Sequence, residues 1–82
     1  MSLTTSDIYD ALAEIFREVF PRASAPPQPD TTSADVPGWD SLGHVSMIGE
    51  IEDRFGIEFR PEEYVEFESV GELVTLIEAK LT

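Results

Sequence analysis

Cysteine is absent from the chain, so neither a disulfide nor a thiolate metal site can stabilise the fold. That absence is natural in a reducing compartment, and we expect a cytoplasmic protein. Positions 1–7 have neither the basic segment nor the apolar run of a secretory signal peptide. No apolar stretch approaches the roughly 20 residues that cross a bilayer, so no membrane span is expected. At 82 residues, the sequence predicts one small domain over positions 1–82.

Basic residues are scarce: 5 Lys and Arg stand against 17 Asp and Glu, which gives a net charge of -12. Such a chain is repelled by nucleic acid and by anionic lipid surfaces, so we expect neither as a partner. Basic patches on other proteins are the surfaces that it would attract. The acids gather between positions 50 and 72, as Glu50, Glu52, Asp53, Glu58, Glu62, Glu63, Glu66, Glu68 and Glu72. The cluster indicates a docking surface, with solubility alone as the other explanation.

Strand patterns are missing too, and the apolar residues recur at helical spacing instead. Near the N-terminus this spacing predicts an amphipathic helix that buries Ile8, Leu12, Ile15, Phe16, Val19 and Phe20. We expect Thr4 to cap this helix in a capping box with Asp7, and Pro21 to end it.

A long loop is predicted between positions 21 and 40, where five prolines lie among small and polar residues. A structureless segment of that length in a small domain is expected to be functional or mobile. Its only large apolar side chains are Val36 and Trp39. We expect at least one of them to hold the loop against the helices.

The second half predicts three more helices. The first spans about 41–55 and turns Val45, Ile48, Ile51 and Phe55 inward, with Leu42 and Met47 toward its flanks. Gly56 is placed to end it, and Pro61 to begin a very short helix through Tyr64. A capping box of Ser69 and Glu72 begins the last helix, whose predicted buried face is Val70, Leu73, Val74, Ile77 and Leu81. The predicted fold is therefore all-α: a small antiparallel four-helix bundle of three long helices and one short one.

Ser41 lies where the loop meets the second helix, and helix capping by Asp40 or Ser41 is the simplest explanation for it. A hydrolase nucleophile fits poorly, because the G-x-S-x-G elbow is absent: of the residues two either side of Ser41, Gly43 is a glycine but Trp39 is not. His44 is the only histidine, and we expect it to be an exposed helix residue near a partner surface. A domain this small cannot easily enclose a substrate, so we expect no catalytic residue.

Metal binding is not expected either. Asp30, Asp35 and Asp40 are spaced too widely for a calcium loop, and the D-x-D-x-D-G pattern is absent. The acidic residues are better explained as a solvated face.

The stretch GWDSLGHVSMIGEIEDRFGIEF, positions 38–59, resembles the phosphopantetheine attachment region of acyl carrier proteins. Asp40-Ser41-Leu42 matches the triplet that starts the family's second helix, and 52–55 and 57–59 match the end of that helix and its connector. The resemblance extends over nearly the whole chain. It implies a non-catalytic carrier with 4′-phosphopantetheine on Ser41. A phosphopantetheinyl transferase would take that group from coenzyme A with Mg²⁺, and Asp40 is the acid that the transferase would recognise.

The resemblance also implies partners that load or process a thioester-linked cargo: an acyl- or aminoacyl-loading ligase, an acyltransferase or a ketosynthase. Basic patches on these enzymes would dock on the acidic surface, for which the candidates are Glu50, Glu52, Asp53, Glu62, Glu63 and Glu66. Apolar contacts beside the serine are expected from Leu42, Val45 and Met47, with core packing as the equal alternative for Val45. We expect a monomer.

The chain departs from the fatty-acid carriers at three positions. Gly43 and Ser46 stand where acids are common in that family, and Gly49 stands where a larger apolar residue is usual. Glycine inside a helix costs about 1 kcal/mol relative to alanine, so a packing or docking reason for Gly49 is expected. These departures favour a specialised pathway over fatty-acid synthesis. The sequence does not identify the cargo: a fatty acyl, polyketide, aminoacyl or other acid group would leave similar marks. The rival hypothesis is an acidic helical interaction module that is never modified.

Overall fold

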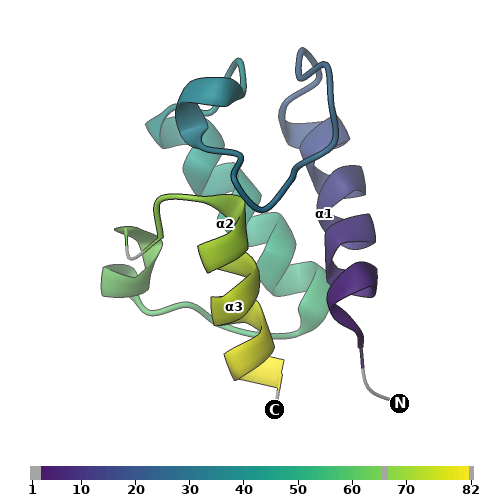
Figure 1. Ribbon diagram of the computed structural model, residues 1–82. Helices are drawn as coiled ribbons and strands as arrows, with labels where there is room; N and C mark the ends of the chain where they lie inside the picture. The colour runs from purple at the N-terminus through teal and green to yellow at the C-terminus, as the bar shows by residue number, and fades with distance from the viewer. Residues whose placement is uncertain (1–2, 66, 82) are drawn as a thin grey trace.

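Three α-helices and two 3-10 turns make up the computed structural model, which describes residues 3–65 and 67–81 (Figure 1). The α-helices are α1 (Thr5–Val19), α2 (Ser41–Phe55) and α3 (Val70–Leu81), and the 3-10 turns are η1 (Ser33–Asp35) and η2 (Pro61–Val65). No strand occurs within those described ranges. In Figure 1, α1 runs antiparallel to both α2 and α3, and the two ends of the chain lie at the same end of the bundle.

The all-α prediction is confirmed, whereas the count of four helices is not: three α-helices are present in the described ranges. The segment expected to be a short helix, Pro61–Val65, is a 3-10 turn. Five residues close few α-helical hydrogen bonds, and the tighter 3-10 winding is the usual form of such short pieces. A second turn, Ser33–Asp35, interrupts the loop that was expected to be structureless.

Local capping sets the start of α1 and the end of α2 as predicted. The Thr4 hydroxyl accepts a hydrogen bond from the Asp7 N–H at 3.1 Å, and the Asp7 carboxylate accepts one from the Thr4 N–H at 2.9 Å. This capping box satisfies two of the N–H groups that a helix start leaves unpaired. At the C-terminal end of α2, Gly56 adopts a φ of 66°, the left-handed conformation that suits glycine at this position.

The start of α3 combines a predicted cap with an unpredicted one. Ser69 accepts a hydrogen bond from the Glu72 N–H, as expected of the capping residue. Two carbonyls of the long loop add to this: Thr31 accepts from the Val70 N–H and Pro29 from the Gly71 N–H, both at 2.9 Å. The loop therefore supplies acceptors for a helix that follows it by more than thirty positions.

One apolar core is shared by the three helices and the loop. Its members are less than a tenth exposed: Ile8, Leu12, Ile15, Phe16, Phe20, Val36, Trp39, Met47, Ile48, Ile51, Phe59, Phe67, Val70, Leu73, Val74 and Ile77. Val36 and Trp39 are both in this list, so the prediction that the loop is held against the helices is confirmed. The Trp39 ring stacks on Phe20 at 5.7 Å and meets Phe16 edge to face at 5.5 Å.

Three positions depart from the predicted core. Met47, expected on a flank of α2, is 0% exposed, whereas Val45, expected in the inner stripe, is 55% exposed. Leu81 is 37% exposed. Met47 belongs to the core that α1, α2, α3 and the loop share, whereas Val45 lies outside it. Leu81 is the last residue of α3.

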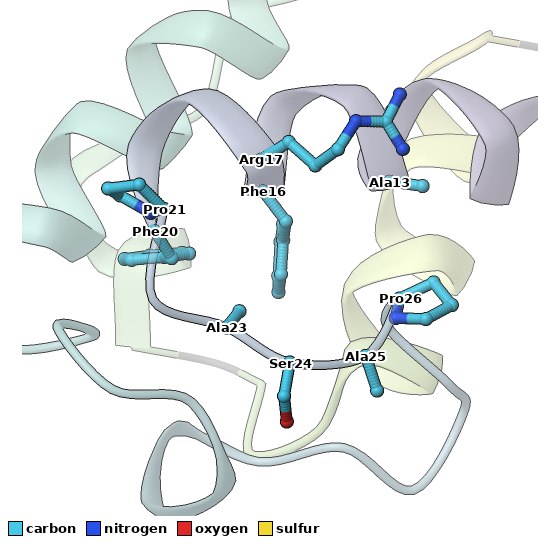
Figure 2. A pocket seen from close by; sticks show the side chains of 9 residues that line it. All are labelled: Ala13, Phe16, Arg17, Phe20, Pro21, Ala23, Ser24, Ala25 and Pro26. Carbon is cyan, nitrogen blue, oxygen red and sulfur yellow. The ribbon is translucent and has the colours of Figure 1, made fainter.

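The first part of the loop folds back along α1 and leaves a cavity of about 390 Å³. Figure 2 shows the Phe16 side chain pointing away from α1 toward this returning segment, near Ala23 and Ser24. The lining consists of Ala13, Phe16, Arg17, Phe20, Pro21, Ala23, Ser24, Ala25 and Pro26. All of these belong to α1 or to the loop that follows it, so this cavity is separate from the start of α2.

Glu63 is the one buried charged residue in the described ranges, at 4% exposure. Its carboxylate accepts a hydrogen bond from the Arg60 N–H at 2.8 Å and pairs with the Lys80 ammonium at 2.7 Å. The backbone hydrogen bond first, and then Lys80, lower the pKa of Glu63 from 4.5 to about 2. The pair joins η2 to the last turn of α3.

Acidification is therefore expected to weaken this joint. Because the folded-state pKa of about 2 lies below the unfolded value of 4.5, the ionised carboxylate stabilises the fold above about pH 4.5. That contribution is lost as the pH falls from 4.5 toward 2. We expect Glu63→Gln to lower the free energy of unfolding at pH 7 and to flatten its acid dependence, measured by urea denaturation at a series of pH values. Glu62→Gln, an exposed neighbour, is the control; equal acid profiles for the two variants would contradict this role.

Candidate functional site

The start of α2 leaves the Ser41 hydroxyl free. Asp40 is the capping residue: its carboxylate accepts a hydrogen bond from the Gly43 N–H at 2.9 Å, and its carbonyl accepts one from the His44 N–H at 2.8 Å. Ser41 is the first residue of the helix and its side chain is exposed. No hydrogen bond of the described residues involves its hydroxyl. Since capping is done by Asp40, capping does not explain the serine.

A tight turn before the helix directs this junction. Gly38 has a φ of 91°, and its carbonyl accepts a hydrogen bond from the Asp40 N–H at 2.9 Å. The same carbonyl lies against Gly43: a Cβ at position 43 would collide with the Gly38 oxygen and come within 2.8 Å of the Phe20 ring. Gly43 is therefore required by the close approach of the turn. This is the structural reason that no acid stands at that position.

An open groove of about 540 Å³ runs beside Ser41. Its walls come from the end of the loop, the first turns of α2 and the segment around η2, through Ser33, Trp39, Asp40, Ser41, His44, Val45, Tyr64, Val65 and Phe67. Two of these, Val45 and Val65, are exposed apolar side chains at 55% and 82%, and the neighbouring Leu42 is exposed at 78%. An exposed apolar rim around a free hydroxyl suits contact with another protein.

Val65 was missed by the sequence reasoning. It lies in an acid-rich segment and belongs to no helical apolar pattern. An apolar residue without periodic partners is not expected in the core face of a helix. This lack of periodicity is the one signal that could have identified Val65 as a surface residue.

His44 does not lie where it was expected. It is half-buried, stacked between the Trp39 ring at 6.2 Å and the Phe67 ring at 5.3 Å. Both ring nitrogens have partners: Nδ1 lies 2.9 Å from the Trp39 Nε1 and Nε2 lies 2.6 Å from the Tyr64 carbonyl oxygen. The prediction of an exposed His44 is wrong, because Trp39 of the loop, Tyr64 of η2 and Phe67 all pack against the ring.

The candidate acidic residues lie in different environments. Glu50 and Asp53 are exposed on the outer face of α2, and Glu62 is exposed on η2, 3.6 Å from Arg60. Glu52 is half-buried and accepts a hydrogen bond from the Phe59 N–H at 2.8 Å, so it holds the connector against α2. Glu63 is buried in its ion pair. Glu66 lies outside the described residues.

Burial therefore removes two predicted contact residues from any surface in this conformation. Met47 and Glu63 are 0% and 4% exposed, so neither can touch a partner without a change in the fold. Gly49 is exposed, and a Cβ there would meet nothing within 4 Å. The packing explanation for Gly49 is thus excluded, and the glycine leaves a flat spot on the outer face of α2 between Val45 and Asp53.

Comparison with known proteins decides what this junction belongs to. Residues 10–77 match the family model described as the phosphopantetheine attachment site. The chain belongs to the acyl carrier protein family. As a carrier of this family, it functions with a covalently attached 4′-phosphopantetheine.

Relatives of this carrier agree over most of its length. The acyl carrier protein of Acidothermus cellulolyticus is 31% identical over 77 residues, 94% of this chain and 92% of the relative. The meromycolate extension acyl carrier protein of Mycobacterium leprae is 30% identical over 78 residues, 95% of this chain and 68% of the relative. The solution structure of the holo acyl carrier protein from Geobacter metallireducens superposes with a TM-score of 0.80 at 37% identity. The superposed part covers 89% of this chain and 84% of the Geobacter chain.

The junction of this carrier fits a phosphodiester-linked group. An exposed alcohol is available at Ser41, and the first turn of a 15-residue helix directs N–H groups and the positive end of its dipole toward an adjacent phosphate. Asp40 keeps its own carboxylate on the Gly43 N–H. Among residues 3–65 and 67–81, no cluster of His, Cys, Asp or Glu could hold a metal ion. Within the same ranges, none of the helices has the length and apolarity to span a bilayer.

Proposed function

We propose that the chain carries acyl or aminoacyl groups on a 4′-phosphopantetheine attached to Ser41. The observation that supports this most strongly is the exposed Ser41 hydroxyl at the first position of α2, with the capping role taken by Asp40. The group supplies a thiol that holds the cargo as a thioester, and the chain itself, which has no cysteine, supplies none. The protein presents the cargo and leaves the chemistry to its partner enzymes.

Attachment requires a phosphopantetheinyl transferase, coenzyme A and Mg²⁺. In that step the Ser41 oxygen forms a bond to the phosphorus next to pantetheine, and the bond from that phosphorus to the oxygen of the adenosine bisphosphate breaks. The hydroxyl proton leaves to a base on the transferase. Ser41 contributes an accessible oxygen, and α2 contributes a positively polarised helix end beside the new phosphodiester. Asp40 contributes the fixed geometry of the turn and is the acid that we propose the transferase recognises.

The partner surface that we propose surrounds Ser41 and continues along the outer face of α2. Its apolar part is Leu42, Val45 and Val65, and its acidic part is Glu50, Asp53 and Glu62, all of them exposed. Charges at such a rim act mainly on the association rate and are screened by salt. Fast, weak docking suits a carrier that visits several enzymes in turn, including a loading ligase, an acyltransferase or a ketosynthase.

Reversing two of these charges tests the surface. The double change Glu50→Lys and Asp53→Lys is expected to raise the KM of the transferase for the chain several-fold at low salt and to leave kcat nearly unchanged. The effect should shrink at high ionic strength. The control is Asp10→Lys with Glu18→Lys, two exposed residues of α1 that change the net charge equally. If both pairs raise KM alike, net charge alone is responsible and the proposed surface is wrong.

Intact mass spectrometry tests the function itself. After incubation with coenzyme A, Mg²⁺ and a broad-specificity transferase, the chain is expected to gain the mass of one phosphopantetheinyl group. The rival hypothesis, an acidic helical module that is never modified, predicts no added mass while a known carrier in the same reaction is fully converted. That outcome would overturn the proposal.

A further inference from the structure

His44 connects the three segments that form the groove beside Ser41. His44 is the fourth residue of α2 and lines the groove. Its ring lies between Trp39, at the end of the loop, and Phe67, after η2. The two hydrogen-bond partners come from the same two sides: the Trp39 indole and the Tyr64 carbonyl. One side chain of α2 thus bridges a residue five positions earlier and one twenty positions later.

The two contacts specify one form of the ring. The Trp39 Nε1–H can only donate, so Nδ1 of His44 must accept and carries no proton. The Tyr64 carbonyl can only accept, so Nε2 must donate and carries the proton. The neutral Nε2–H tautomer is the single form that satisfies both partners. A second proton, on Nδ1, would set two N–H donors against each other at 2.9 Å.

We propose that His44 is a positioning residue which, as the neutral Nε2–H tautomer, holds the loop end and the η2 segment on the two sides of Ser41. This inference rests on the proposed function, since the shape that it maintains is the one a transferase would meet. The exposed rim residue Val65 directly follows Tyr64, the residue whose carbonyl His44 holds. Trp39 directly precedes Asp40, the cap that fixes Ser41. Loss of the bridge therefore affects both rims of the groove without touching the serine.

Two variants separate the bridge from simple packing. His44→Phe keeps a flat ring between Trp39 and Phe67 but removes both hydrogen bonds. His44→Gln retains an acceptor and a donor on one side chain. We expect His44→Phe to raise the KM of the transferase for the chain about tenfold with little change in kcat, because two partly buried polar partners lose their bonds. His44→Gln should restore most of the affinity, because its side chain again offers one acceptor and one donor.

Nuclear magnetic resonance tests the bridge without any transferase. The unmodified wild-type chain should show the ¹⁵N shifts of an Nε2–H imidazole at neutral pH. The indole N–H of its single tryptophan should shift in His44→Phe, because its hydrogen bond to Nδ1 is lost. A wild-type ring found as the Nδ1–H tautomer, or a His44→Phe variant with unchanged KM and indole resonance, would overturn the inference. Failure of modification in every variant would instead refute the proposed function, and the spectra would still decide on the bridge.

Discussion

Ser41→Ala is expected to abolish the addition of phosphopantetheine completely and to leave the fold unchanged. The reaction needs the hydroxyl oxygen, for which alanine offers no substitute. The helix start does not need it, because Asp40 supplies the cap through the Gly43 N–H. An exposed substitution of this kind changes the free energy of unfolding by no more than about 0.5 kcal/mol. Intact mass spectrometry and urea denaturation measure the two halves of this prediction.

Ser46→Ala is the matched control for that experiment. Ser46 is also exposed on α2, just over one turn after Ser41, and we expect this variant to gain one phosphopantetheinyl group at the wild-type rate. Modification that persists in Ser41→Ala would show that another hydroxyl is the attachment site. A Ser41→Ala variant that is unmodified only because it is unfolded would show that the serine has a structural role after all.

Gly43→Ala is expected to destabilise the protein by about 1–3 kcal/mol, the usual range for overpacking a close contact. In an ordinary helix the same change would stabilise by about 1 kcal/mol. The difference arises because the added Cβ collides with the Gly38 carbonyl oxygen, a backbone atom, and lies 2.8 Å from the Phe20 ring. Relief requires movement of the turn that positions Asp40 and Ser41. Urea denaturation of the variant, with the slope fixed to that of the wild type, measures the effect.

Gly49→Ala provides the contrast on the same helix. Its Cβ would enter open space, so we expect the intrinsic preference to act alone and stabilise the protein by about 1 kcal/mol. Opposite signs at positions 43 and 49 are the signature of the proposed contact. If both variants stabilise the protein, the turn does not press on the start of α2 as described.

Local signals explain why so much of the fold could be predicted. The first helix was predicted from an apolar stripe and from a capping box whose two residues lie three positions apart, and the structure contains both. Gly56 and Ser69 likewise mark the end of α2 and the start of α3 by short-range chemistry. Each of these depends only on residues within a few positions of each other, so the sequence contains the whole interaction.

Long-range packing explains what could not be predicted. The exchange of Met47 and Val45 between core and surface depends on where the loop and η2 settle against α2, which no helical period contains. Glu63 looked like one more surface acid until Lys80, seventeen positions later, was found beside it. The partial burial of His44 was not predicted for the same reason, because its partner Tyr64 is twenty positions away.

The candidate site divides along the same line. Ser41 and Asp40 were identified from the resemblance of a short motif, and the roles of cap and free hydroxyl then followed from the structure. Val65 could be placed beside the serine only by tertiary structure, since it comes from another segment. The groove is in this sense a product of the fold, whereas the proposed attachment residue belongs to a motif that the sequence shows directly.

The most direct test of the central claim is to locate the added group. The chain modified by a transferase with coenzyme A and Mg²⁺ is fragmented in the mass spectrometer, and the position of the added mass is read from the fragment series. We predict that the phosphopantetheinyl mass is absent from every N-terminal fragment that ends at or before Asp40. It should be present in every N-terminal fragment that includes Ser41. The same mass found at any other hydroxyl, or no added mass beside a fully converted control carrier, would contradict the account.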